Sequence, residues 1–590
     1  MNQNNKFGIG TSINEGELDP NRIKILYSIL LILLGLLLLQ LGRKQILEYG
    51  RYKAMAQDQQ VAKVTSEPER GLIYAYDRTA SDFGVSEVRA NKQFHPLAIN
   101  INKYDILVIP HNVGDPEKTA QALCDKLKDI DCGKLTSDLK TNKLYLPPIA
   151  KRIEKDQAEA IKNLNLKGVM VVPNSIRQYP EGNMAAQILG FVNFDGQGSY
   201  GIERYYNNEL KGVPGVIYGV KDTHGRVIDV NDQAKAQNGI SLVLTIDSTV
   251  QFIIERELKS AIEKYGAEGG TIIVAEPKTG RIIAMASLPA YDPNKFNEVP
   301  KDDQWKFVNP SVTYTWEPGS IFKPVVMAAA IDQGLVEPDT KGDKCFGNSV
   351  EIDGYTIHNA EDKAHGCETM TQILENSDNV AMTWVAAKLD KELMGRYLGD
   401  FGFGNKTGID VEAESKGKYL DPKQWRDVHR ATIAFGQGIS VTPIQMVEAY
   451  SAIANGGKLV KPHLLDRVIS TSGEEKEIQT TEVRQVVKKE TADKVKEMLV
   501  SVVERGHGKA AQVEGFKVAG KTGTAQVVKD TGGYDENAHI GGFIGFAPAD
   551  DPKFVMLVKL DKPTNVKFAE SSAAPTFGTI AKWLLTNYYR

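Results

Sequence analysis

Three short motifs in this sequence combine residue types that can carry out acyl transfer. The first reads Ser320-Ile321-Phe322-Lys323 and follows a Pro-Gly pair. If a helix begins near Ser320, the serine hydroxyl and the Lys323 amine lie one turn apart on the same face. A serine becomes a good nucleophile when a base accepts its proton, and a lysine amine can do so if burial or positive neighbours lower its pKa. Many surface helices contain this pattern by chance, so it needs support from the rest of the chain.

The second motif is Ser377-Asp378-Asn379. The Ser377 hydroxyl can relay a proton, and the Asn379 amide can orient a peptide substrate. Taken alone, the motif is better explained as a loop or a helix cap, because Ser, Asp and Asn are preferred at helix N-termini.

The third motif is Lys521-Thr522-Gly523, followed by Thr524, within an apolar run typical of a strand. A strand edge can bind an extended peptide through main-chain hydrogen bonds. Lys521 and the hydroxyls of Thr522 and Thr524 can hold a terminal carboxylate, while Gly523 leaves room for close approach. Two other Lys-Thr-Gly copies, at 278–280 and 406–408, are interpreted as a hairpin turn and a Gly-rich loop.

Composition places the chain among ordinary globular proteins. It has 590 residues, 42% hydrophobic and 25% charged, with a formal net charge of −4. This length predicts two or more folded units. The charge gives no basic footprint of the kind that nucleic-acid binding leaves, so no nucleic-acid partner is expected.

One segment departs from this average and predicts a membrane anchor. Residues 25–41 contain no charge and are rich in leucine, with Arg22 and Lys24 before them and Arg43 and Lys44 after them. Seventeen residues are at the short end for a bilayer span. A buried core helix and a cleaved signal peptide are the alternatives, but no small-x-small cleavage pattern follows. Basic residues on both sides leave the orientation undecided from charge.

The order of expected elements predicts an α+β protein with a largely antiparallel sheet. Residues 1–24 are expected to be a tail, 25–41 the anchor, 42–235 an N-terminal domain and 240–590 the domain that carries all three motifs. Residues 45–64 are expected to continue the anchor as a helix. A helix capped by Asp247 or Ser248 is expected next to strands at both ends of the last domain.

Four cysteines lie beyond the anchor. In an oxidising compartment, Cys124 could pair with Cys132 and Cys345 with Cys367, each closing a short loop. Unpaired core cysteines are the alternative. A zinc site is disfavoured because neither pair has Cys-x-x-Cys spacing.

The three motifs, in this order, match the signature of penicillin-recognising serine enzymes. Nearly everything after residue 20 resembles the class B penicillin-binding proteins, and within them the division-type rather than the elongation-type members. In the first matching segment, which begins at Arg70, the residues Ala75-Tyr76 lengthen the usual spacing before Asp77-Arg78. The matching segments outside the motifs are Arg70-Gly71-Leu72-Ile73 with Asp77-Arg78, Arg177-Gln178-Tyr179-Pro180, Gly198-Ser199-Tyr200-Gly201-Ile202-Glu203, Thr245-Ile246-Asp247, Phe435-Gly436-Gln437-Gly438 and Gly545-Phe546-Ala547-Pro548.

The resemblance implies a transpeptidase fold after a non-catalytic, elongated pedestal of the dimerisation type. It also implies a D,D-transpeptidase that cross-links peptidoglycan stem peptides and is acylated by β-lactams, without a metal or organic cofactor. Ser320 would be the nucleophile, Lys323 its base and Ser377 a proton relay. Asn379, Lys521, Thr522, Gly523 and Thr524 would bind the donor, and the backbone N–H groups of Ser320 and Thr524 would form the oxyanion hole.

The resemblance further implies a location and partners. The N-terminus would lie inside the cytoplasmic membrane and the catalytic domain outside it, with a polytopic SEDS-type glycosyltransferase and divisome scaffold proteins as partners. Two other functions remain open from the sequence. A β-lactamase would share the motifs but has no use for a pedestal, and a catalytically idle scaffold or β-lactam sensor would not need all of the motif residues.

Overall fold

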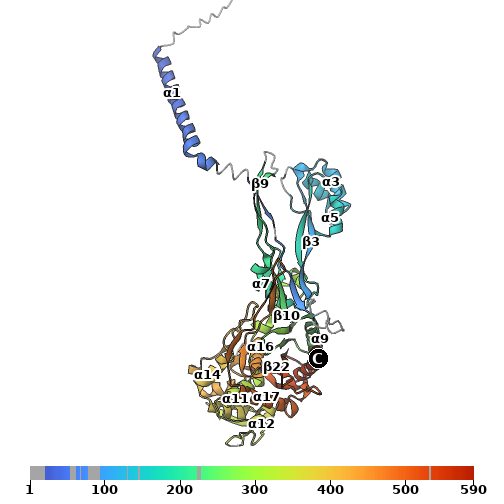
Figure 1. Ribbon diagram of the computed structural model, residues 1–590, viewed down its shortest axis with the longest axis vertical. Coiled ribbons are helices and arrows are strands. Elements are labelled where there is room, and N and C mark those ends of the chain that lie inside the picture. The colour runs from blue at the N-terminus through green and yellow to red at the C-terminus, as the bar shows by residue number, and fades with distance from the viewer. Residues whose placement is uncertain are drawn as a thin grey trace, which may run out of the picture. The chain divides into compact units, whose positions relative to one another are not determined.

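The computed structural model describes residues 20–53, 61–66, 68–77, 94–128, 130–141, 143, 146–221, 227–343, 345–529 and 533–590. Its contacts divide the chain into two compact units, one formed by residues 1–67 with 214–236 and the other by 68–213 with 237–590 (Figure 1). The predicted domain boundaries at 235 and 240 stay a prediction.

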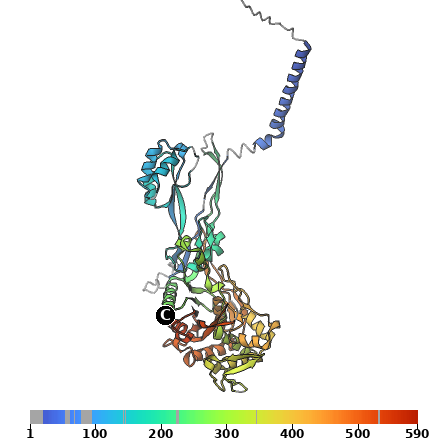
Figure 2. The ribbon, with the colours of Figure 1, turned by 180° about the vertical axis from the view of Figure 1, so that it is seen from behind.

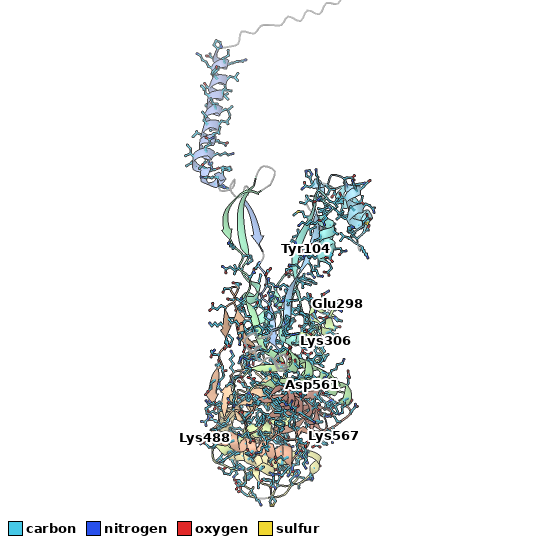
Figure 3. All side chains as sticks on the ribbon, turned by 45° about the vertical axis from the view of Figure 1, so that its right-hand side comes forward. Tyr104, Glu298, Lys306, Lys488, Asp561 and Lys567 are labelled. Atoms are coloured by element: carbon cyan, nitrogen blue, oxygen red, sulfur yellow. A yellow bond between two sulfur atoms is a disulfide. The ribbon has the colours of Figure 1, made fainter. Side chains whose placement is uncertain are left out.

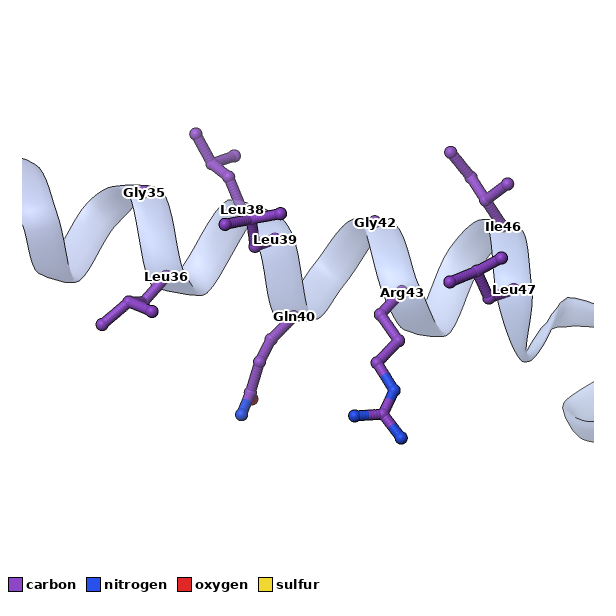
Figure 4. Close-up of a pocket in the computed structure, with 9 residues that line it drawn as sticks. All are labelled: Gly35, Leu36, Leu38, Leu39, Gln40, Gly42, Arg43, Ile46 and Leu47. Carbon is purple, nitrogen blue, oxygen red and sulfur yellow. The ribbon is translucent and has the colours of Figure 1, made fainter.

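The first unit contains the apolar helix α1 (Pro20–Gly42), which continues into the one-turn π-helix η1 (Arg43–Leu47). None of their residues is buried, and the stretch Pro20–Leu47 is long and apolar enough to cross a membrane, with a mean hydropathy of 2.5 over an 18-residue window. Leu38 and Ile46 point to one side of this helix, while Gln40 and Arg43 point to the other (Figure 4). Length and composition therefore fit a single membrane anchor.

A three-stranded antiparallel sheet completes the first unit. Its order is β1-β8-β9, formed by Val61–Ser66, Gly215–Lys221 and Val227–Ala234. The helix predicted for residues 45–64 is therefore wrong from residue 61 onward. Val61, Val64 and Thr65 are β-branched and fit a strand, and pairing with β8 supplies the hydrogen bonds that a helix would have made.

The second unit is built around a five-stranded antiparallel sheet of order β12-β11-β23-β22-β21. Helices α9 and α18 cover one face with a continuous apolar core, and a larger core under α11, α13, α16 and α17 covers the other (Figure 1). The predicted α+β fold is confirmed. The strand bounds are β11 Gly269–Ala275, β12 Ile282–Leu288, β21 Ala519–Val528, β22 Tyr534–Ala547 and β23 Phe554–Asp561.

Side chains surround this sheet on all sides of the second unit (Figure 3). Asp561, labelled there, is the last residue of β23. Helix α9 has Asp247 as its N-cap, which accepts hydrogen bonds from the N–H groups of Thr249 and Val250, as predicted for this boundary. The helix bounds are α9 Ser248–Tyr265, α11 Lys323–Asp332, α12 Met370–Glu375, α13 Asn379–Lys388, α14 Lys391–Asp400, α16 Pro443–Ala454, α17 Lys489–Glu504 and α18 Ala573–Trp583.

A second sheet joins distant parts of the chain, in the order β19-β18-β10-β2-β3-β4, with β5 paired to β3. Its outermost strands are β19 (Glu475–Glu477) and β4 (Ala150–Ile153). Strand β10 (Ser241–Asp247) pairs in parallel with β2 (Ile73–Tyr76) and antiparallel with β18 (Leu465–Ile469). Strands β3 (Phe94–Val108) and β5 (Val169–Gln178) form a two-stranded ribbon that carries α3 (Pro116–Cys124) and α5 (Lys155–Lys162), as both views show (Figures 1 and 2).

Three of the segments that match class B proteins meet in a buried ion-pair cluster. The carboxylate of Glu203, which is fully buried, accepts hydrogen bonds from Arg70 Nε at 2.8 Å and Arg177 Nε at 2.7 Å. Tyr179 also donates to it, at 3.2 Å. Burial acts to raise the pKa of Glu203, but the two guanidiniums win and hold it below its ordinary value. This cluster ties the three segments into one structural element.

Replacing Glu203 with alanine is expected to destabilise the second unit by about 3–5 kcal/mol, because two guanidiniums would stay buried without their counter-ion. The measurement is the unfolding midpoint in a thermal or denaturant series. Glu209→Ala, which removes an exposed carboxylate from the next helix, is the matched control and should change stability by less than about 0.5 kcal/mol. Equal midpoints for the two variants would contradict this role for Glu203.

Both predicted cysteine pairs are disulfides. Cys124 bonds to Cys132, eight residues away, and Cys345 bonds to Cys367, 22 residues away. The second pair closes the segment that contains the hairpin of β13 (Ser349–Ile352) and β14 (Tyr355–His358).

Candidate active site

Ser320 lies in a short 3-10 turn, Gly319–Phe322, directly before helix α11. In a 3-10 turn residues three apart lie above one another, so the Ser320 and Lys323 side chains emerge on the same side, as predicted. Gly319 has φ +59°, a backbone conformation that favours glycine. Its N–H donates to the carbonyl of Gly436 at 3.1 Å, so the loop at 435–438 supports the start of the turn.

The edge strand β21 passes against this turn, and Gly523 makes the approach fit. A Cβ at Gly523 would lie 2.9 Å from Ile321 Cγ2 and 3.0 Å from the Ile321 nitrogen and the Pro318 carbonyl oxygen. Gly436 is under a similar constraint, since its Cβ would lie 2.2 Å from the Gly319 carbonyl oxygen. The room that Gly523 provides is therefore filled by the turn that contains Ser320, and the predicted part of Gly523 in substrate binding stays a prediction.

Lys323 is fully buried, and its amine contacts the second motif. Lys323 Nζ donates to the Ser377 carbonyl oxygen at 2.5 Å, to Asn379 Oδ1 at 2.8 Å and to Ser377 Oγ at 3.2 Å. A lysine ammonium has three protons and can donate to all three acceptors, whereas a neutral amine has two and keeps a lone pair that can accept a proton. The first two motifs, 54 residues apart in sequence, thus meet at one nitrogen.

The third motif contacts the same serine hydroxyl. Lys521 is fully buried, and its Nζ donates to Ser377 Oγ at 3.0 Å. A hydroxyl oxygen has two lone pairs, so Ser377 Oγ can accept from both lysines while its own proton remains available to donate. The predicted residues Lys323, Ser377 and Lys521 are therefore brought together around one hydroxyl.

The two lysines share an environment that favours the neutral amine. Burial lowers the pKa of Lys323 well below its ordinary value, and the charge of Lys521 lowers it further, although Asp378 and Glu368 oppose both effects. Burial also lowers the pKa of Lys521 to about 7, while Glu570 acts to raise it. A lysine with a depressed pKa can accept a proton near neutral pH, as a general base must.

Ser377 occupies a strained turn that neighbouring residues hold in place. Its φ is +56°, which is unfavourable for a residue with a side chain. Asp378 is the N-cap of α13 and accepts from the Ala381 N–H at 2.6 Å. Asn359 donates to Asp378 Oδ2 at 2.8 Å and accepts from the Asn379 N–H at 2.8 Å. Such strain persists only where the surroundings over-determine it, and it is frequent at active sites.

Strand β21 is the edge strand of its sheet, with β22 on one side. This agrees with the prediction that its free edge is available to an extended peptide. Along the strand, Lys521 points toward Ser377, while Thr524 Oγ1 accepts from the Ala569 N–H at 3.1 Å. Thr522 is 7% exposed. The carboxylate-binding roles of both threonines stay predictions.

The other two Lys-Thr-Gly copies have structural explanations, as predicted. The copy at 278–280 forms the turn between β11 and β12, where Thr279 Oγ1 donates to Glu276 Oε2 at 3.0 Å. In the copy at 406–408, Glu414 accepts hydrogen bonds from the Thr407 N–H at 2.6 Å and the Gly408 N–H at 3.1 Å. Among the hydrogen bonds of the described residues, only the copy in β21 contacts another of the motifs, through Lys521 and Ser377.

Sequence reasoning missed several residues that support the site. Glu317, three residues before Ser320, accepts from the Gly438 N–H and the Tyr534 hydroxyl, both at 2.9 Å. It thereby links the turn that contains Ser320 to the loop at 435–438 and to the start of β22. Asn359 and Glu368, which contact the second motif, have no spacing signal because they lie in an irregular segment. The sequence feature that could have indicated Glu317 is its position three residues before Ser320.

Comparison with known families agrees with this geometry. A model described as the penicillin-binding protein transpeptidase domain matches residues 270–582, which include all three motifs. A second, described as the penicillin-binding protein dimerisation domain, matches residues 65–244.

Individual relatives extend the similarity over most of the chain. Stage V sporulation protein D of Bacillus subtilis is 37% identical over 560 residues, covering 92% of this chain and 82% of the relative. Peptidoglycan D,D-transpeptidase FtsI of Escherichia coli is 32% identical, covering 82% and 80%. The crystal structure of penicillin-binding protein 3 from Mycobacterium tuberculosis, complexed with aztreonam, superposes with a TM-score of 0.68 at 27% identity, covering 89% of this chain and 97% of that one. The dimerisation model matches the first part of the chain and the transpeptidase model the second, and a 37% identical relative aligns with 92% of the chain. The chain therefore belongs to the class B penicillin-binding proteins.

Proposed function

We propose that this protein cross-links peptidoglycan stem peptides by D,D-transpeptidation through an acyl-enzyme on Ser320. The observation that carries the proposal is the meeting of Lys323 Nζ and Lys521 Nζ on the Ser377 hydroxyl, beside the turn that holds Ser320. Relatives named as peptidoglycan D,D-transpeptidases support the choice of substrate.

In the first half of the reaction, Ser320 Oγ bonds to the carbonyl carbon of the penultimate D-alanine, and the neutral Lys323 amine takes the hydroxyl proton. Backbone N–H groups of Ser320 and Thr524 stabilise the oxyanion. The carbon–nitrogen bond to the terminal D-alanine then breaks. Ser377, whose oxygen already accepts from two lysines, donates the proton that the leaving nitrogen needs and takes up the proton held by Lys323, so that Lys323 is neutral again.

In the second half, an amine from a neighbouring stem peptide bonds to the acyl carbon and gives one proton to the neutral Lys323 amine. The ester bond to Ser320 breaks, and the serine regains a proton from the Lys323–Ser377 pair. Asn379 orients the donor, while Lys521 with Thr522 and Thr524 binds its terminal carboxylate at the edge of β21. β-Lactams acylate Ser320 because their strained amide resembles the donor terminus, and solved relatives bound to aztreonam and ampicillin support this sensitivity.

The membrane arrangement follows from the substrate. Wall peptides lie outside the cytoplasmic membrane, so the N-terminus is inside and everything after α1 is outside. The two disulfides support this placement, because disulfides persist in oxidising compartments. We also propose a polytopic SEDS-type glycosyltransferase and divisome scaffold proteins as partners.

The septum is the proposed site of action, in keeping with relatives named FtsI. A sporulation role is the second candidate, because one relative that aligns with 92% of the chain is a stage V sporulation protein. Depletion of the protein separates the two: dividing cells that form filaments support the septal role, whereas normal division with defective spores supports the other.

The activity itself is tested with the purified full-length chain in detergent. Incubation with a penicillin is expected to add one drug mass to the protein, and peptide mapping to place it on the peptide that contains Ser320. Incubation with a stem pentapeptide and an amine acceptor should release D-alanine and form a cross-linked product. Rapid turnover of the penicillin without a stable adduct would favour a β-lactamase, and no adduct on folded protein would favour a scaffold.

A further inference from the structure

Two buried carboxyl groups lie close together beside the Ser377 turn. Glu368 is 3% exposed and Asp378 is 1% exposed, and Asp378 acts together with burial to raise the pKa of Glu368. Two carboxylates offer only acceptors, so a hydrogen bond between them requires that one of them holds a proton. With that proton, the pair carries a single negative charge.

The remaining contacts decide which carboxyl carries the proton. Both oxygens of Asp378 accept N–H hydrogen bonds, one from Ala381 and one from Asn359. Glu368 Oε1 accepts from Asn376 Nδ2 at 2.6 Å, whereas no donor among the described residues reaches the buried Glu368 Oε2. A carboxyl oxygen that receives no hydrogen bond is the natural site for the proton, so Glu368 is the neutral acid and donates to Asp378.

The residues that Glu368 approaches, Asn376 and Asp378, lie on either side of Ser377. Glu368 Oε1 accepts from Asn376, and a proton on Oε2 can be donated to Asp378, so Glu368 can hold the residues on both sides of Ser377. Ser377 is the residue with φ +56°, and its carbonyl and hydroxyl oxygens both contact Lys323. We infer that neutral Glu368 is a positioning residue for acyl transfer, which fixes the Ser377 turn and limits the negative charge beside Lys323.

The charges that surround Glu368 make its positioning role sensitive to pH. Burial raises the pKa of Glu368 to about 7, with Asp378 adding to the effect and the hydrogen bond from Asn376 and the charge of Lys323 opposing it. Lys323 in turn faces Lys521, and His365 lies in the field of Asp378, Lys363, His507 and Lys323. When Glu368 loses its proton, two adjoining carboxylates repel each other and the added charge favours the protonated form of Lys323, which cannot act as a base.

The inference rests on the proposed function, and Glu368→Gln tests it, because glutamine keeps a donor for Asp378 and an acceptor for Asn376 but cannot ionise. The rate of acylation by a fluorescent penicillin is measured for the full-length chain in detergent from pH 5.5 to 9. At pH 5.5 we expect Glu368→Gln to react within about threefold of the wild type. Above pH 8 its rate should exceed that of the wild type by about tenfold, the scale of a small displacement of a catalytic group. Lys521 also loses charge in this range, but it does so in both proteins and leaves their ratio unaffected.

Two controls sharpen the comparison. Glu392→Gln removes an exposed carboxylate from α14 and should follow the wild type at every pH. Glu368→Ala removes the carboxyl group and its contacts on both sides of Ser377, and it should lower acylation at all pH values by about tenfold to a hundredfold. A ratio between Glu368→Gln and wild type that does not change with pH would overturn the inference.

Unfolding midpoints give a readout that does not depend on activity. The folded pKa of Glu368, about 7, is above its ordinary value of 4.5, so the folded wild type keeps a proton that the unfolded chain releases between these values. The wild type should therefore lose stability relative to Glu368→Gln as pH rises from about 4.5 to 7, with no further change above. A difference that is constant over this range would also overturn the inference. If neither the wild type nor any variant is acylated, the proposed function is wrong. The unfolding midpoints would then still test the protonation of Glu368.

Discussion

Replacing Ser320 with alanine is expected to reduce acylation by penicillin to background, a loss on the order of 10⁴-fold or more, because no other group can form the acyl bond. The substitution removes one oxygen from a half-buried side chain, and the Pro318–Phe322 turn keeps its packing against β21. Stability should therefore change by less than about 0.5 kcal/mol, and loss of reaction would report on chemistry rather than on folding.

The measurement is gel labelling of membranes with a fluorescent penicillin. A band near 65 kDa, the mass of the chain, should appear for the wild type and vanish for Ser320→Ala. Ser472→Ala, in the exposed turn after β18, is the matched control and should label normally. A label that persists in Ser320→Ala would show that another side chain is the nucleophile, and peptide mapping would identify it. Normal division in cells that carry only this variant would favour the scaffold function.

Replacing Lys323 with methionine is expected to slow acylation by about 10²- to 10⁴-fold, the usual contribution of a general base. Methionine is of similar length and apolar, so it suits a fully buried site, but it cannot take a proton. It also leaves the Ser377 carbonyl oxygen and Asn379 Oδ1 without their donor, and this adds to the loss. The rate is followed by stopped incubation with a fluorescent penicillin.

Lys323→Arg separates the two roles that a buried lysine can have. Arginine keeps the positive charge but stays protonated at every accessible pH. If Lys323 is the base, the arginine variant should be slow like the methionine variant; if its charge is what matters, arginine should restore much of the rate. For the wild type, acylation should rise with pH through the depressed pKa of Lys323, since only the neutral amine is basic. An unfolding midpoint for each variant shows whether the site has kept its structure.

What the sequence determined by itself was local. The spacing of Ser320 and Lys323 predicted one helical turn, and the apolar run around Lys521 predicted a strand; both depend only on residues a few positions apart. The leucine-rich run at 25–41 likewise predicted a span from composition, and Asp247 predicted the start of α9 from its capping chemistry. The helix expected to run through residue 64 failed where pairing with β8 offset local helix propensity.

Only the tertiary structure decided which distant groups meet. It joined Lys323, Ser377 and Lys521 around one hydroxyl, placed Glu203 between Arg70 and Arg177, and put Glu368 against Asp378. None of these contacts follows from spacing, because each depends on how packed helices and paired strands fix side chains that lie far apart in the chain. The same packing removes water from the two lysines and so sets their pKa values. The sequence determined which residues could do the chemistry, while burial and convergence, which exist only in the folded chain, decided the state in which they do it.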